Sequence, residues 1–306
     1  MALIMNRVRL YFLERPFNAM GSPCEIKLYA KTRSRAEHMA GRVIAEIARL
    51  EARYSRYRPD SLLSDINRVA AAGAQIAVDE ETASLLNYVA TCYLESDGLF
   101  DITSGVLRHV WKFRDGQLPA PADIEALLSR VGWHRLRWNP PVLEFPEPGL
   151  ELDFGGAVKE YAVDRVAALC WEAEIRHGLI NLGGDIKIIG PHPDGRPWAI
   201  GIQHPRKPGQ FIQTLHLRHG AMASSGDYER CIVMDGVRYG HVLNPRTGWP
   251  VSHLASVSVV ADLCVVAGSA STIAMLKEAE GPAWLADMGI PHYWVDVAGM
   301  PGGSLR

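Results

Sequence analysis

The chain has 306 residues, of which 48% are hydrophobic and 22% are charged. A chain of this size can bury a sizeable core as one large domain or as two lobes. The formal net charge of −2 gives no general reason to expect nucleic acid or an acidic membrane surface as a partner. The five cysteines are far apart and include no CxxC pair. Neither a disulfide framework nor a zinc site is indicated, and buried free thiols in a reducing compartment are expected.

The N-terminal segment MALIMNRVRLYFLERPF carries arginines within its apolar stretch and has no small-residue cleavage site. No run approaches the roughly 20 apolar residues that a membrane span requires. The sequence therefore predicts a soluble, cytoplasmic protein without stable membrane insertion. Removal of an export leader would instead place the mature protein in the periplasm.

The first half of the chain predicts two strands followed by helices. The strands are expected over residues 9–15 and 23–30, separated by NAMGS. An amphipathic helix is predicted over residues 34–54, with Ser34 and Glu37 as a capping box. Three helices are predicted next, over residues 61–67, 79–95 and 119–131, and Asp79 is expected to cap the second of them. A Pro-interrupted hairpin is predicted over residues 138–152.

The stretch from 152 to 185 holds a predicted helix between two paired-glycine turns. The first turn is Gly155-Gly156 and the second is Gly183-Gly184. Glycines let the backbone approach a ligand closely, and a helix N-terminus offers free N–H groups to phosphate oxygens. Lys159 lies in the first helical turn, where a cation opposes the helix dipole, so an anionic ligand explains it better. The alternative is an ordinary strand–turn–helix–strand unit with glycines serving only as turns.

The second half is richer in strands. Strands are predicted over residues 179–181, 198–203, 211–217, 231–234, 255–261 and 292–297, and a helix over 265–280. Residues 223–228 are expected to form a loop. Strands and helices without a regular βαβ repeat predict an α+β fold.

Loops rich in Gly, Ser, Asp and Tyr occur around Met20, Tyr57, Phe100-Asp101 and residues 225–227. With the glycine turns and a later loop they form an ordered series: NAMGS, SRYRPDSLLSDIN, GLFDITSG, LDFGGAVKEYAVD, INLGGD, ASSGDYER, HVLNPRTG and a terminal A-x-x-x-ST segment. In this order the series resembles the ApbE family, the FAD:protein FMN transferases, from about residue 17 to residue 297. No single motif is diagnostic, but the colinear set is very specific.

The resemblance implies a mixed α+β fold of mostly antiparallel sheets with packed helices. It implies one domain over residues 1–306, or two lobes with the FAD site between them. The implied reaction is the Mg²⁺-dependent transfer of FMN from FAD to a Thr or Ser hydroxyl of a target flavoprotein, with release of AMP. FAD is then a substrate, and the acceptor flavoprotein is the partner.

The resemblance also assigns residues. Those that would lie against FAD are Met20, Tyr57, Leu99, Phe100, Asp101, Asp153, Lys159 and Leu243. The carbonyl of Gly156 and the hydroxyls of Ser271 and Thr272 would bind the metal. His241 is the candidate general base or phosphate contact, because imidazole titrates near neutral pH. Asp227 is a candidate for contacting the incoming hydroxyl.

Two positions depart from the family pattern. Gly268 stands where the family has an Asp that binds the metal, so we expect weaker Mg²⁺ binding; Asp262 or Asp185 are the alternative carboxylates. Glu160 stands where many members have Gly, and its charge would repel FAD unless it faces away. Two alternative functions therefore stay open: an FAD-binding protein without transferase activity, and a Mg²⁺-dependent FAD pyrophosphatase. Weak metal binding further predicts that Gly268→Asp lowers the Mg²⁺ requirement.

Overall fold

The centre of the computed structural model, which describes residues 9–305, is an eight-stranded sheet in the order β1-β2-β6-β7-β10-β13-β14-β15. Every neighbouring pair of strands in it is antiparallel. The strands are β1 (Tyr11–Ala19), β2 (Ser22–Ala30), β6 (Gly178–Leu182), β7 (Asp185–Gly190), β10 (Ala221–Gly226), β13 (Leu254–Ala261), β14 (His292–Asp296) and β15 (Pro301–Gly303). The predicted α+β class with mostly antiparallel sheets is confirmed.

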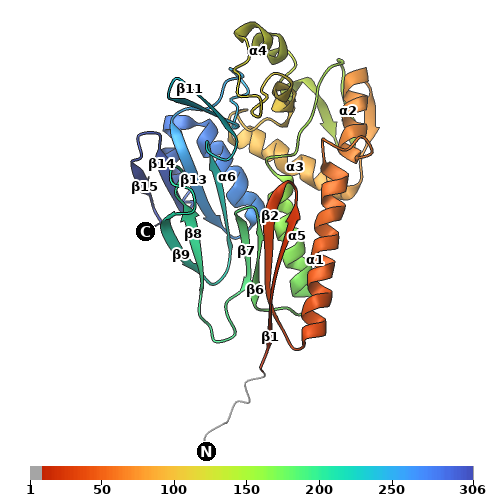
Figure 1. Ribbon diagram of the computed structural model, residues 1–306. Helices are drawn as coiled ribbons and strands as arrows, with labels where there is room; N and C mark the ends of the chain where they lie inside the picture. The colour runs from red at the N-terminus through yellow and green to blue at the C-terminus, as the bar shows by residue number, and fades with distance from the viewer. Residues whose placement is uncertain (1–8, 306) are drawn as a thin grey trace, which may run out of the picture.

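Three helices pack against the sheet (Figure 1). Helix α1 (Arg33–Tyr54) contacts β1 and β2, α5 (Val158–Glu172) contacts β6 and β7, and α6 (Cys264–Leu276) contacts β10 and β13. Because α5 contacts both α1 and α6, it is the middle helix of this layer. The hairpin of β8 (Trp198–Gln203) and β9 (Phe211–Leu217) forms a separate apolar cluster with side chains of β6, β7 and β10. Helix α5 therefore lies over the middle strands of the sheet.

The remaining elements gather mainly around the upper end of the molecule as drawn in Figure 1. The helices there are α2 (Leu62–Ala72), α3 (Glu80–Glu95), α4 (Pro121–Leu128) and the 3₁₀ segments Ile102–His109 and Trp133–Arg135. The strands are β3 (Gln75–Ala77), β4 (Arg137–Asn139) and β5 (Val142–Glu144) in one small sheet, and β11 (Cys231–Met234) with β12 (Val237–Gly240) in another. A 3₁₀ turn (Glu278–Glu280) and α7 (Gly281–Asp287) follow α6.

Three local predictions are wrong. Thr32, not Ser34, caps α1, and its hydroxyl accepts the N–H of Arg35. The helix expected to end near residue 67 continues to Ala72 and stops at Gly73, whose φ of 66° is left-handed. Most of the loop expected over residues 223–228 is strand β10 instead, because these small residues pair with β13.

Within residues 9–305, none of the helices combines the length and the apolar character that crossing a membrane requires.

Candidate functional site

The β1–β2 turn and the second glycine turn, between β6 and β7, lie against each other at one end of the central sheet. In the β1–β2 turn, Met20 and Gly21 have φ angles of 51° and 72°, and Gly183 in the β6–β7 turn has a φ of 61°. A Cβ atom on Gly183 would lie 2.7 Å from Cβ of Ser22 and 3.9 Å from Nζ of Lys159. The close approach requires glycine, and it brings both turns to the first turn of α5.

Lys159 is paired with Asp185 at the start of β7. Its Nζ lies 2.7 Å from Asp185 Oδ2, and 28% of the lysine side chain remains exposed. Burial raises the pKa of Asp185, although the Lys159 charge opposes this. Burial alone would lower the pKa of Lys159, but the charges of Asp185 and then Glu160 raise it overall. Lys159 is therefore a charged, accessible ammonium beside the glycine turns.

An exposed aromatic ring and several arginines lie near these turns. Tyr57 is 74% exposed, the Arg56 guanidinium lies 5.0 Å from the centre of its ring, and Arg56 Nη2 donates to the tyrosine hydroxyl at 2.9 Å. Partial burial acts to raise the pKa of Tyr57, but Arg56, then Arg230 and Arg108, lower it overall. Nη2 of Arg230 would be 3.9 Å from a Cβ on Gly21. This surface offers a flat ring and positive charge, which suits an aromatic anion.

The first glycine turn is packed against Phe100 and held by Asp153. The Gly155 N–H donates to Asp153 Oδ1 at 2.9 Å, and the other carboxylate oxygen accepts from Arg56. A Cβ on Gly156 would meet the Phe100 ring at 3.3 Å. Phe100 is 5% exposed. Asp153 thus joins the glycine turn to Arg56, the arginine on Tyr57.

Three other predicted FAD contacts have structural roles in the protein itself. Asp101 Oδ1 accepts from the N–H and hydroxyl of Thr103, and Oδ2 accepts from the Trp133 N–H at 2.9 Å. Leu99 belongs to the main core, and Leu243 packs on the apolar cluster around Trp111. Their contacts with FAD stay predictions.

His241 follows β12 and lies near Arg230. The residue is exposed to solvent, yet neighbouring protein atoms partly desolvate the imidazole. This desolvation, followed by the charge of Arg230, lowers the pKa of His241, with smaller influences from Lys159 and Asp227. The imidazole is therefore neutral at pH 7 and keeps one ring nitrogen as an acceptor, but the lowered pKa makes it a weaker base than an ordinary histidine.

Asp227 forms a bidentate ion pair with Arg206, whose Nη1 and Nη2 donate to its two oxygens at 2.6 Å and 2.7 Å. Asp227 is 4% exposed. Such a pair fixes the loop before β11. A contact between Asp227 and an acceptor hydroxyl stays a prediction, and it would have to coexist with this pair.

A group of oxygens lies between β10, α5 and α6. The Ser225 hydroxyl is 2.8 Å from Ser271 Oγ and 2.9 Å from Thr272 Oγ1. Glu160, on α5, is buried beside Gly268 of α6 and interacts with Asp185. Burial and then the Asp185 charge raise the pKa of Glu160 to about 8. Hydroxyls and carboxylates are ligands that Mg²⁺ accepts.

The model of the ApbE family matches residues 20–294. The chain belongs to the ApbE family. Among similar ApbE proteins, the FAD:protein FMN transferase of Klebsiella pneumoniae strain 342 is 32% identical over 247 residues, which are 79% of this chain and 75% of the relative. The FAD:protein FMN transferase of Chlamydia pneumoniae is 32% identical over 260 residues, covering 82% and 80%.

Crystal structures of ApbE proteins have the same architecture. The Thermotoga maritima ApbE protein has a TM-score of 0.88 at 29% identity and covers 96% of this chain and 97% of its own. The Pseudomonas stutzeri flavinyl transferase ApbE in its apo form has a TM-score of 0.85 at 27% identity, covering 99% and 96%. The ApbE fold is therefore present over nearly the whole chain.

Residue types alone do not show which polar groups join this ApbE site. Arg230, Arg56 and Ser225 are brought to it by turns and strand pairing, while Arg206 reaches it through Asp227. Ser225 stands in the ASSGDYER motif, which is the one signal that could have found it.

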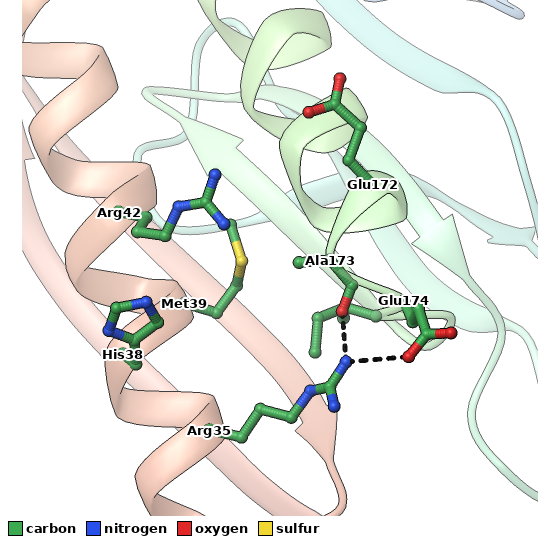
Figure 2. Close-up of a pocket in the computed structure, with 8 residues that line it drawn as sticks. Arg35, His38, Met39, Arg42, Glu172, Ala173 and Glu174 are labelled. Carbon is green, nitrogen blue, oxygen red and sulfur yellow. Dashed lines mark hydrogen bonds and ion pairs between the residues drawn. The ribbon is translucent and has the colours of Figure 1, made fainter.

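Two surface pockets lie away from these residues. One of about 410 Å³ lies between α1 and the end of α5 (Figure 2), where Arg35 donates to the Ala173 carbonyl at 2.6 Å and to Glu174 at 3.2 Å. The other, of about 470 Å³, is bordered by Asp262. Apart from Asp262, none of the predicted site residues lines either pocket.

Proposed function

We propose that this ApbE protein transfers FMN from FAD to a Thr or Ser hydroxyl of an acceptor flavoprotein, in a Mg²⁺-dependent reaction that releases AMP. The observation that carries the proposal is the meeting of Lys159, the β1–β2 turn, the second glycine turn and Arg230 at one end of the sheet. Relatives named FAD:protein FMN transferases support the choice of flavin donor and protein acceptor.

In this reaction the acceptor hydroxyl attacks the FMN phosphorus of the FAD pyrophosphate. A bond forms between the hydroxyl oxygen and that phosphorus, the bond from the phosphorus to the bridging oxygen breaks, and AMP leaves. Such a step needs positioning and neutralisation of negative charge rather than covalent help from the enzyme. Lys159 supplies positive charge, and it lies in the first turn of α5, where the helix dipole also favours an anion.

The oxygens present fit a magnesium ion. By the family resemblance, the hydroxyls of Ser271 and Thr272 and the Gly156 carbonyl would hold it. The two hydroxyls share Ser225 as a hydrogen-bond partner, and one buried carboxylate oxygen on each of Glu160 and Asp185 lacks a hydrogen-bond partner among the described residues. When bound, the ion would neutralise phosphate charge. Tyr57 and Arg56 would meet the flavin or its ribityl chain at the exposed edge.

His241→Asn is expected to lower the maximal rate of transfer about 100-fold, the effect of losing a general base. FAD affinity should stay within about twofold, because Asn keeps a polar contact at this exposed position. The rate is measured as covalent flavin formed on the acceptor, and FAD affinity by quenching of flavin fluorescence. An unchanged rate in the folded variant would exclude His241 as the base.

The proposed function is tested by incubating the purified protein with FAD, Mg²⁺ and an acceptor domain that carries one Thr in its flavinylation site. Fluorescent flavin should remain on the acceptor after denaturation, and the acceptor mass should rise by that of FMN less one water. EDTA should abolish the transfer, and a Thr→Val acceptor should stay unmodified.

The same assay separates the two alternatives. AMP and free FMN formed without an acceptor would indicate a pyrophosphatase. Tight FAD binding with neither product would indicate a flavin carrier. The carrier hypothesis depends on the missing carboxylate at Gly268, and the structure places the Glu160 carboxyl beside that position.

A further inference from the structure

Gly268 and Glu160 fill one space between α6 and α5. A Cβ atom on Gly268 would lie 2.5 Å from Glu160 Cγ, 2.9 Å from its Cδ and 3.0 Å from its Oε1. Cβ atoms essentially never come within 3.0 Å of such atoms. The Glu160 carboxyl therefore occupies the volume that a side chain at position 268 would need.

This carboxyl is buried without full compensation. Glu160 is 8% exposed, and among residues 9–305 its Oε2 has no hydrogen-bond partner. Oδ2 of the neighbouring Asp185 lies 2.7 Å from Lys159 Nζ but receives no aligned hydrogen bond. One ammonium faces two carboxyl groups, so ionisation of both would leave an excess negative charge. Buried charges of this kind are normally paired or bind a metal.

Hydroxyl groups lie one helical turn further along α6 and on the facing strand β10. Ser271 is one helical turn beyond Gly268 on α6, and its hydroxyl donates to the Gly268 carbonyl at 2.9 Å. The Ser225 hydroxyl is hydrogen-bonded to the hydroxyls of both Ser271 and Thr272. Within the described chain there is no group of three or more His, Cys, Asp or Glu side chains able to hold a metal. The groups that are present offer carboxyl and hydroxyl oxygens, which are hard ligands and favour Mg²⁺ or Mn²⁺ over zinc.

We infer that Glu160 supplies the carboxylate ligand of the divalent cation in this protein, from α5 rather than from position 268 on α6. The inference rests on the Mg²⁺ dependence in the proposed function. It explains Glu160 and Gly268 together. The carboxylate is provided by α5 instead of α6, and the glycine at position 268 leaves space for it. A divalent cation also reverses the excess negative charge, so that Glu160 does not oppose the phosphates of FAD.

The first test measures Mn²⁺ binding to the full chain by electron paramagnetic resonance, with Mn²⁺ alone and again with FAD present. Glu160→Gln keeps the size of the side chain and removes its charge. We expect it to weaken Mn²⁺ binding tenfold or more, since even residues behind the direct ligands change metal affinity 10- to 100-fold. The matched control is Glu172→Gln at the exposed end of the same helix, which should bind Mn²⁺ as the unchanged protein does.

The second test moves the carboxylate. The double variant Glu160→Gly/Gly268→Asp should bind Mn²⁺ within about threefold of the unchanged protein, with folding checked by circular dichroism. Equal Mn²⁺ binding by Glu160→Gln and the unchanged protein would overturn the inference, as would the absence of Mn²⁺ binding with FAD present. Flavin transfer is scored separately. If the protein transfers flavin but Mn²⁺ binding does not depend on Glu160, only this inference is contradicted. If Mn²⁺ binding depends on Glu160 but no flavin is transferred, only the proposed function is contradicted.

Discussion

Lys159→Gln is expected to lower the rate of FMN transfer about 100-fold or more, the typical effect of removing one group that stabilises transition-state charge. The ammonium lies in the first turn of α5, where the helix dipole disfavours a cation. It is held there by Asp185 at 2.7 Å and remains partly exposed beside Gly183. Gln keeps most of the length of the side chain, so the loss reports on charge. Lys159→Arg, which retains the charge, should keep more activity than Gln.

The measurement is the initial rate of covalent flavin formation on the acceptor domain at saturating Mg²⁺. Because Asp185 is buried and loses its cation, each variant also needs a thermal melt. Lys27→Gln is the matched control, since Lys27 pairs with Glu14 and Glu25 on the β1–β2 hairpin. A folded Lys159→Gln protein that transfers FMN at the original rate would remove Lys159 from the mechanism.

The position of Lys159 in the first turn of α5, directly after a glycine turn, could be predicted from the sequence because its signal is local. A glycine pair, a helix start and a lysine in the first turn occur within five residues, and local patterns of this kind need no knowledge of the fold. The same holds for Asp79, whose side chain caps α3 as predicted. The strand and helix periods likewise gave the α+β class.

Contacts between distant segments could not be predicted in this way. Ser224 and Ser225 favour a loop by composition, but Ser224 pairs with Ser258 across β10 and β13 at 2.7 Å, and Ser225 meets α6. The sequence also gives no sign that residues 160 and 268 share one space. From the sequence, Glu160 and Gly268 are two unrelated departures from the pattern of the resemblance. In the structure, the Glu160 side chain fills the space that a side chain at position 268 would need.

That relation reverses the expectation for Gly268→Asp. Sequence reasoning predicts that the added carboxylate lowers the Mg²⁺ requirement. In the structure the new Cβ would be 2.5 Å from Glu160 Cγ, and a second acid would enter a buried space that already holds Glu160 and Asp185. Overpacking and an uncompensated buried charge together should lower the free energy of unfolding by roughly 3 to 5 kcal/mol. Urea denaturation followed by circular dichroism, without added metal, measures the loss.

Glu160→Gly in the same chain should restore most of that stability, because it removes both the clash and one of the crowded charges. The two single variants and the double variant form a cycle, and a large favourable coupling between the changes is expected, since only neighbours depart strongly from additivity. Glycine at 160 carries its own loss of about 1 kcal/mol in a helix interior, so Glu160→Ala is the reference for the steric part. Additive effects in the cycle would mean that the side chains at 160 and 268 do not compete for the same space. Coupling, in contrast, would show that a carboxylate fits from α5 or from α6, but not from both.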